Sequence, residues 1–151
     1  VEENNFGIGR SDDLINQISQ ISGYLSLAAW IISLITILGS SIALMNIMLV
    51  SVTERTREIG LRKALGAKKS IIAGQFLMET IMIGQFGGLL GIILGIGIGI
   101  LISTVANFNF TTPWMAMLAA TAVTLFVAIV AGLFPALKAA KLDPVESLRY
   151  E

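Results

Sequence analysis

The sequence contains neither cysteine nor histidine, and only three of its 151 residues are proline. The absence of cysteine and histidine excludes thiol and imidazole catalysis, disulfide bonds and the common zinc sites. Ten Lys and Arg balance ten Asp and Glu, so the formal net charge is zero, and the chain has no overall attraction to nucleic acid. The sequence accordingly predicts no catalytic residue, no metal site and no cofactor bound by this chain.

Charged residues are also scarce, at 13 % of the chain against about 25 % in soluble domains. Apolar residues make up 55 % of the sequence, and the mean hydropathy is +0.84. No charge lies between Asp13 and Glu54, and none lies in the 58 residues between Glu79 and Lys138. A membrane-spanning helix needs about 20 apolar residues, so the second gap has room for two spans and a turn. The fold class predicted is an all-α membrane protein with three transmembrane helices.

The distribution of polar residues divides the chain into segments. Ser11 and the acids after it are typical of a helix start, and Pro113 with its Asn and Thr neighbours is typical of a turn. We expect Pro135 and Lys138 to end the last span. The predicted segments are an extracytoplasmic lead-in (1–23), a transmembrane helix (24–52), a cytoplasmic helix (53–68), an interfacial helix near 69–80 with a transmembrane helix after it (together 69–103), an extracytoplasmic loop (104–114), a transmembrane helix (115–135) and a cytoplasmic tail (136–151).

Basic residues predict the orientation. With three spans, nine of the ten Lys and Arg fall on one side, and the positive-inside rule makes that side cytoplasmic. The nine are Arg55, Arg57, Arg62, Lys63, Lys68, Lys69, Lys138, Lys141 and Arg149. Residues 1–23 then lie outside the cytoplasm. A chain that starts there needs an earlier span or a cleaved signal, so we expect sequence upstream of Val1.

Residues 54–70, ERTREIGLRKALGAKKS, hold six of the ten basic residues in one charged segment. A phosphate-binding Walker A loop requires G-x-x-x-x-G-K-[ST]. Gly66 is followed by Ala67 rather than Lys, and Leu61 occupies the position of the first glycine. The charged segment therefore does not match a nucleotide-binding loop.

Two other interpretations of the charged segment remain open on these residues alone. Clusters of Lys and Arg beside a span attract anionic lipid, which is consistent with a solvated loop. Glu54 and Glu58 interrupt the basic residues, however, and the apolar Ile59, Leu61 and Leu65 have no use in a free loop. An amphipathic helix that docks into a protein groove is the alternative.

Local signals favour a helix within the charged segment. Ser51 and Glu54 have capping-box spacing. Glu54 precedes Arg57 by three residues and Glu58 precedes Arg62 by four, the spacings at which opposite charges pair on a helix. Gly66 is well placed to end the helix.

Two long motifs carry a resemblance to a known family. SVTERTREIGLRKALGAKKSII (51–72), with QFLMET (75–80), resembles the permease signature of MacB/FtsX-type ABC transporters. FPALKAAKLDPVESLRYE (134–151) resembles the closing motif of the same family, P-A-x-x-A-A-x-x-D-P-V-E-x-L-R. The resemblance extends over nearly all of residues 40–151.

The resemblance implies a dimeric permease with four spans and a large extracytoplasmic domain between the first two. This chain would contain spans two to four, without that domain. The loop after the second span would be the coupling helix, which rests on a cytoplasmic ATPase that holds ATP and Mg. By that resemblance the residues that contact the ATPase are Glu54, Arg55, Arg57, Glu58, Ile59, Gly60, Arg62, Lys63, Leu65 and Gly66.

The function implied is a permease of the bacterial inner membrane that transmits motion from the ATPase to an extracytoplasmic domain. It would export a drug, a peptide or a lipoprotein, and a periplasmic adaptor and an outer-membrane channel are further partners that the family implies. ATP hydrolysis would belong to the partner rather than to this chain. The alternative is a non-transporting, FtsX-like anchor that regulates a cell-wall hydrolase or senses an antimicrobial peptide.

Three further features have structural interpretations. Glu79 lies one turn from Gln75, near the cytoplasmic interface, and we expect it to reach water or a basic residue rather than to relay protons. Asp143, Pro144 and Glu146 are typical of a helix start. Glycines at four- and three-residue spacing allow helices to approach closely, and we expect them to pack the last two spans together; they are Gly84, Gly88, Gly91, Gly95 and Gly99.

Overall fold

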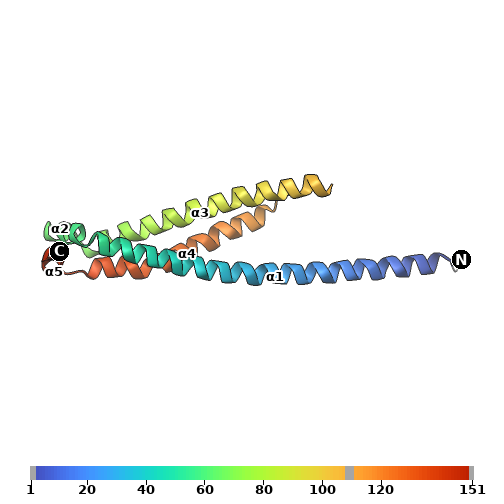
Figure 1. Cartoon of the computed structure of the whole chain (residues 1–151), viewed down its shortest axis with the longest axis horizontal. Coiled ribbons are helices and arrows are strands. Elements are labelled where there is room, and N and C mark those ends of the chain that lie inside the picture. Colours follow the sequence, from blue (N-terminus) through green and yellow to red (C-terminus); the bar gives the residue numbers. More distant parts are fainter. Residues whose placement is uncertain (1–2, 108–110, 150–151) are drawn as a thin grey trace. The chain divides into compact units, whose positions relative to one another are not determined.

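The computed structural model describes the backbone of residues 3–107 and 111–149 and the side chains of 12–107 and 111–147. In that part of the chain every element is a helix (Figure 1). The helices are α1 (Glu3–Glu54), α2 (Thr56–Ala64), α3 (Lys69–Ala106), α4 (Trp114–Lys141) and α5 (Pro144–Arg149). The chain forms two units, residues 1–39 and residues 40–151. The first unit consists of the N-terminal part of α1, and the second contains the tertiary packing described below.

Three of these helices are long and apolar enough to cross a membrane. The candidate spans are Asp12–Glu54, Lys69–Ala106 and Trp114–Lys141. Large apolar side chains are exposed along all three, as expected where the surrounding solvent is lipid. The predicted all-α membrane fold with three transmembrane helices is therefore confirmed.

Several expected helix ends lie inside longer helices. Ser11 and Ser51 are both internal to α1, so neither is a cap. Pro135 is buried within α4, which continues to Lys141. Proline removes one backbone hydrogen bond, but membrane helices tolerate this where neighbouring helices compensate. Residues 69–80 and the span after them form one helix, α3, without a break. Residues 108–110 and 150–151 of the predicted loop and tail lie outside the described part.

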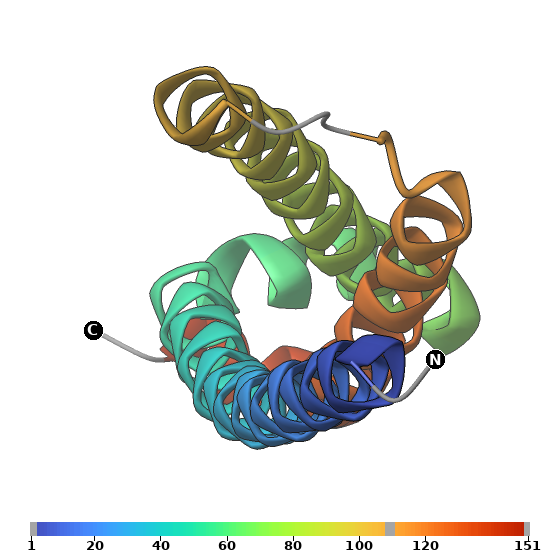
Figure 2. The same ribbon diagram turned by 90° about the vertical axis from the view of Figure 1, so that its right-hand side faces the viewer.

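Helices α3 and α4 pack as an antiparallel pair. A Cβ added to Gly84 would lie 2.7 Å from the Ala128 Cβ, and one added to Gly88 would lie 3.0 Å from Thr124 Oγ1. An added Cβ at Gly91 or Gly95 would meet nothing within 4 Å. The two helices are thus tightly packed in the halves nearer α2 and separate toward their connected ends (Figure 2).

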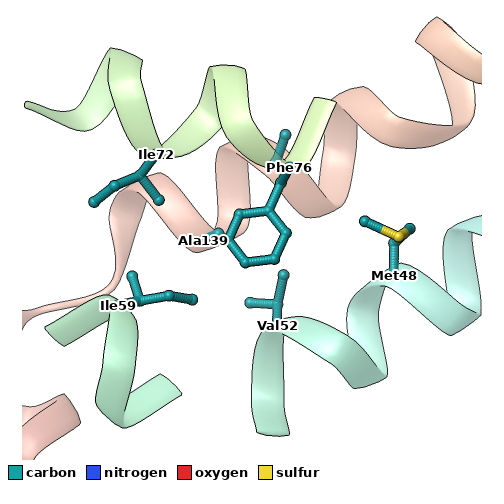
Figure 3. Packing of buried hydrophobic residues seen from close by; sticks show 7 residues of the cluster. Met48, Val52, Ile59, Ile72, Phe76 and Ala139 are labelled. Carbon is teal, nitrogen blue, oxygen red and sulfur yellow. The ribbon is translucent and has the colours of Figure 1, made fainter. Parts of the chain in front are cut away.

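A hydrophobic cluster joins four helices of the second unit. In Figure 3 the Phe76 ring of α3 lies among side chains of α1, α2 and α4. The buried members of the cluster are Met48, Val52, Ile59, Ile72, Phe76, Ala136 and Ala139. The short helix α2 packs on this cluster through Ile59.

Candidate functional site: the short helix α2

The charged segment folds as helix α2 between two well-defined breaks. Arg55 separates α2 from α1 and offers no side-chain cap. At the other end Gly66 has a φ of +95°, which glycine adopts at little cost. The amides of Gly66 and Ala67 donate to the carbonyls of Lys63 and Arg62, each at 3.0 Å. These two bonds form a Schellman motif, so the prediction that Gly66 ends the helix is confirmed.

Helix α2 has an inner and an outer face. Ile59 and Gly60 are buried on the inner face, and Ile59, at 2 % exposed, belongs to the hydrophobic cluster. Residues four apart share a helix face, and Arg57, Leu61 and Leu65 follow one another at that spacing on the outer face. Leu61 is 53 % exposed and Leu65 is 81 % exposed. The outer face therefore combines charged and apolar side chains.

Lys63 lies on the inner side of α2 and binds the end of α4. Its Nζ donates to the Ala140 carbonyl at 2.6 Å and also to the Leu142 carbonyl. The last carbonyls of a helix lack intrahelical partners and carry partial negative charge, so an ammonium group is well suited to cap them. Burial lowers the pKa of Lys63 below its ordinary value, the nearby Lys69 lowers it further, and Asp143 opposes the shift.

Helix α5 packs against the inner side of α2 (Figure 1). A Cβ added to Gly60 would lie 2.5 Å from the Ser147 Cβ, so only glycine allows this approach. The Asp143 Oδ1 accepts a bond from the Val145 amide at 2.8 Å, which confirms Asp143 as the cap of α5. Ser147 is only 3 % exposed. The two short helices are therefore closely packed at the end of the bundle.

Two other basic residues bind α3. Arg55 Nη1 lies 3.3 Å from Glu79 Oε2, and Arg62 Nη1 donates to Gln75 Oε1 at 2.7 Å. Glu79 thus has a basic partner, as expected. In residues 12–107 and 111–147 this is the single ion pair, so the predicted Glu54–Arg57 and Glu58–Arg62 pairs do not form. Arg62 binds Gln75 of α3 rather than Glu58 of its own helix, and Arg55, between α1 and α2, binds Glu79 of α3.

The structure therefore divides the ten candidate contact residues. Ile59, Gly60 and Lys63 face the bundle. The remaining seven are exposed: Glu54, Arg55, Arg57, Glu58, Arg62, Leu65 and Gly66. Contact with an ATPase stays a prediction for all ten.

Two exposed apolar residues, one on α2 and one on α5, were not among the ten candidate contact residues. Leu61 is exposed on α2 beside Arg57, and its four-residue spacing to Leu65 would have revealed the shared face. Val145 on α5 is 79 % exposed, and no sequence signal indicates that its helix packs against α2, because that packing depends on the Gly60–Ser147 contact.

Of the glycine candidates, Gly84 and Gly88 lie at the α3–α4 contact. Gly91 and Gly95 are exposed, and Gly99 is partly buried. The five therefore do not form one continuous contact.

A bundle of long apolar helices with a short charged helix packed at one end defines an integral membrane protein. Residues 30–144 match the family model described as FtsX-like permease C-terminal. The chain belongs to this family, and the resemblance to MacB/FtsX-type permeases is confirmed.

Curated relatives agree with this assignment. The chain is 39 % identical over 149 residues to "Uncharacterized ABC transporter permease YknZ" of Bacillus subtilis, covering 99 % of the chain and 38 % of that protein. It is 43 % identical over 146 residues to "Macrolide export ATP-binding/permease protein MacB" of Bdellovibrio bacteriovorus, covering 97 % and 22 %. A second Bacillus subtilis protein, "Uncharacterized ABC transporter permease YvrN", is 50 % identical over 107 residues, covering 71 % and 26 %. The chain thus spans well under half the length of each relative.

Proposed function

We propose that this chain is the part of an ABC transporter permease that receives motion from a cytoplasmic ATPase through the outer face of α2. The observation that carries the proposal is the exposure of Leu61 and Leu65 on a helix whose opposite face is already buried. An amphipathic helix held in this way suits a protein groove. The bonds of Arg55 and Arg62 to α3 leave fewer free basic groups for a lipid-binding loop.

The proposed mechanism is mechanical. ATP and Mg bind the ATPase, which is either a fused domain or a separate subunit, and closure of an ATPase dimer displaces α2. Two permease copies in the inner membrane transmit the displacement to an extracytoplasmic domain, and the long helix α1 is one route for it. The name of the MacB relative refers to macrolide export and ATP binding, and export is the activity that we propose here. A periplasmic adaptor and an outer-membrane channel would complete the export path.

Alanine substitution on the outer face tests the proposal. Leu65→Ala and Leu61→Ala should each weaken binding of the separately produced ATPase by about 5- to 30-fold, the effect of losing about 1–2 kcal/mol. Membrane insertion should not change, since neither side chain is buried. The matched control is Met115→Ala, which shortens a side chain as exposed as that of Leu65 at the far end of α4. Wild-type ATPase binding by both leucine variants would contradict the proposal.

The charge reversal Glu58→Arg tests the same face by another route. Glu58 is exposed and forms no ion pair within 12–107 and 111–147, so its reversal should alter the ATPase contact without unfolding α2. Gly60→Leu, which the sequence also suggests, is a poorer test, because its side chain would collide with Ser147 and disturb α5.

A further inference from the structure

The contacts between α2 and the C-terminal segment are closer than a cytoplasmic tail requires. Lys63 donates to two carbonyls at the end of α4. Gly60 lies against Ser147, and Asp143 caps the helix that contains Ser147. These residues link α2 to α4 by contacts that are independent of the peptide connection through Arg55.

We propose that Lys63, Gly60 and residues 142–147 form a clamp that holds α2 on the cytoplasmic end of α4, so that displacement of α2 moves α4 directly. This proposal rests on the proposed function, since it names the helix that receives the motion. Lys63 is a positioning residue in this clamp: it faces the α4 carbonyls rather than the outer face of α2.

The connections on the two sides of α2 differ in kind. Toward α1 the chain is continuous, but Arg55 interrupts the helix with a φ of −97° and a ψ of 13°, and a non-helical residue is a place where two helices can reorient. Toward α4 the clamp combines the charge-assisted hydrogen bonds of Lys63 with the contact between Gly60 and Ser147. This contact is too close for any side chain at position 60. A displacement of α2 should therefore move α4 more than it moves α1.

Helix α4 is in turn tightly packed on α3. Gly84 contacts Ala128 and Gly88 contacts Thr124 at distances that leave no room for a larger side chain. Packed interfaces of this kind move as units rather than deform continuously. The clamp would thus move the α3–α4 pair together.

The first experiment measures the clamp without the ATPase. In the full-length permease, hydrogen exchange of the α2 amides should be about tenfold faster in Lys63→Met, the effect expected when charged hydrogen bonds are lost. Lys68→Met is the matched control: Lys68 is exposed and its Nζ forms no hydrogen bond or ion pair among the described side chains, so wild-type exchange is expected. Equal exchange in the two variants would overturn the clamp.

A second pair of variants covers the case in which Lys63→Met fails to fold. Gly60→Ala introduces a Cβ at 2.5 Å from the Ser147 Cβ and should also accelerate α2 exchange. Ser147→Gly removes that Cβ, so the double variant should return toward the exchange of Ser147→Gly alone. If the α2 amides of the double variant exchange as fast as those of Gly60→Ala, the contact between Gly60 and Ser147 does not hold α2.

The second experiment tests transmission in the assembled transporter. ATP should change hydrogen exchange at residues 138–142 of the wild type, and this change should fall at least fivefold in Lys63→Met when both proteins are saturated with the ATPase. An unchanged ATP effect in Lys63→Met would overturn the proposal. Absence of any ATPase binding by the wild type would instead contradict the proposed function, and the exchange measured without ATPase would still decide the clamp.

Discussion

Gly132 of α4 and Thr80 of α3 are packed so closely that a Cβ on Gly132 would lie 2.7 Å from the Thr80 Cβ and 2.8 Å from its Oγ1. Thr80 is fully buried, and its hydroxyl donates to the Phe76 carbonyl at 2.9 Å. The contact continues the series formed by Gly84 and Gly88 one and two turns further along α3. In lipid, where apolar burial gives little drive for helix association, such close packing is a main source of stability.

Gly132→Ala should therefore lower the thermal unfolding midpoint in detergent, because overpacking costs about 1–3 kcal/mol. Gly91→Ala is the matched control on α3: its added Cβ meets nothing, and no decrease is expected. The double variant Thr80→Gly with Gly132→Ala moves the glycine from α4 to α3, and it should recover part of the decrease in the unfolding midpoint. Equal midpoints for Gly132→Ala and Gly91→Ala would contradict the close contact.

Ile59→Ala should destabilise the attachment of α2 by about 2–4 kcal/mol, since it leaves a cavity in the cluster that joins four helices. The measurable result is faster proteolysis in α2 of the purified permease. Leu61→Ala removes a similar side chain from the outer face of the same helix and should change stability by less than about 0.5 kcal/mol. If the two variants are cleaved at the same rate, Ile59 does not anchor α2.

Glu79→Gln should have little effect on stability or on the pH profile of transport-linked ATP hydrolysis. The carboxylate is partly exposed and pairs with Arg55 at 3.3 Å, and pairs of this kind contribute about 0–1 kcal/mol. The double variant Arg55→Glu with Glu79→Arg exchanges the two charges and should restore the stability that either reversal alone loses. A proton relay predicts the opposite result, a pH profile that is displaced or abolished in Glu79→Gln.

Gln85→Leu should raise the thermal unfolding midpoint by an amount equivalent to about 1 kcal/mol. In the described residues the Gln85 Nε2 is buried without a hydrogen-bond partner, and a buried donor without a partner is unfavourable. Gln85 lines a hollow of about 290 Å³ between α3 and α4, with Thr121 and Thr124 opposite. A lower midpoint in the full-length permease would show that Gln85 has a partner there.

Local signals predicted the features that neighbouring residues decide. Gly66 ends α2 because its positive φ satisfies the last carbonyls of the same helix, and Asp143 caps α5 through an amide two residues away. The cap predicted at Ser51 was wrong for a related reason: α1 continues through it, since packing of Met48 and Val52 in the cluster extends the helix beyond the local signal.

Charge patterns were a weaker guide to partners. Glu54 and Glu58 have basic residues at pairing distance along the helix, yet Arg55 and Arg62 bind α3 and Lys63 binds the end of α4. A basic residue in a segment predicted to be cytoplasmic is expected to face water. Lys63 instead faces the bundle, because the unpartnered carbonyls at the end of α4 lie within its reach.

The sequence by itself determined that the chain is a helical membrane protein and how many candidate spans it holds, and it favoured a short helix after the first of them without excluding a solvated loop. These conclusions depend on hydropathy, on the spacing of charges and on turn residues, all of which act over a few positions. Only the tertiary structure decided which face of α2 is exposed and that α5 packs against its buried face. It also decided that Gly84 is part of a helix contact while Gly91 is not. These features depend on residues far apart in sequence, whose proximity is set by how the helices pack.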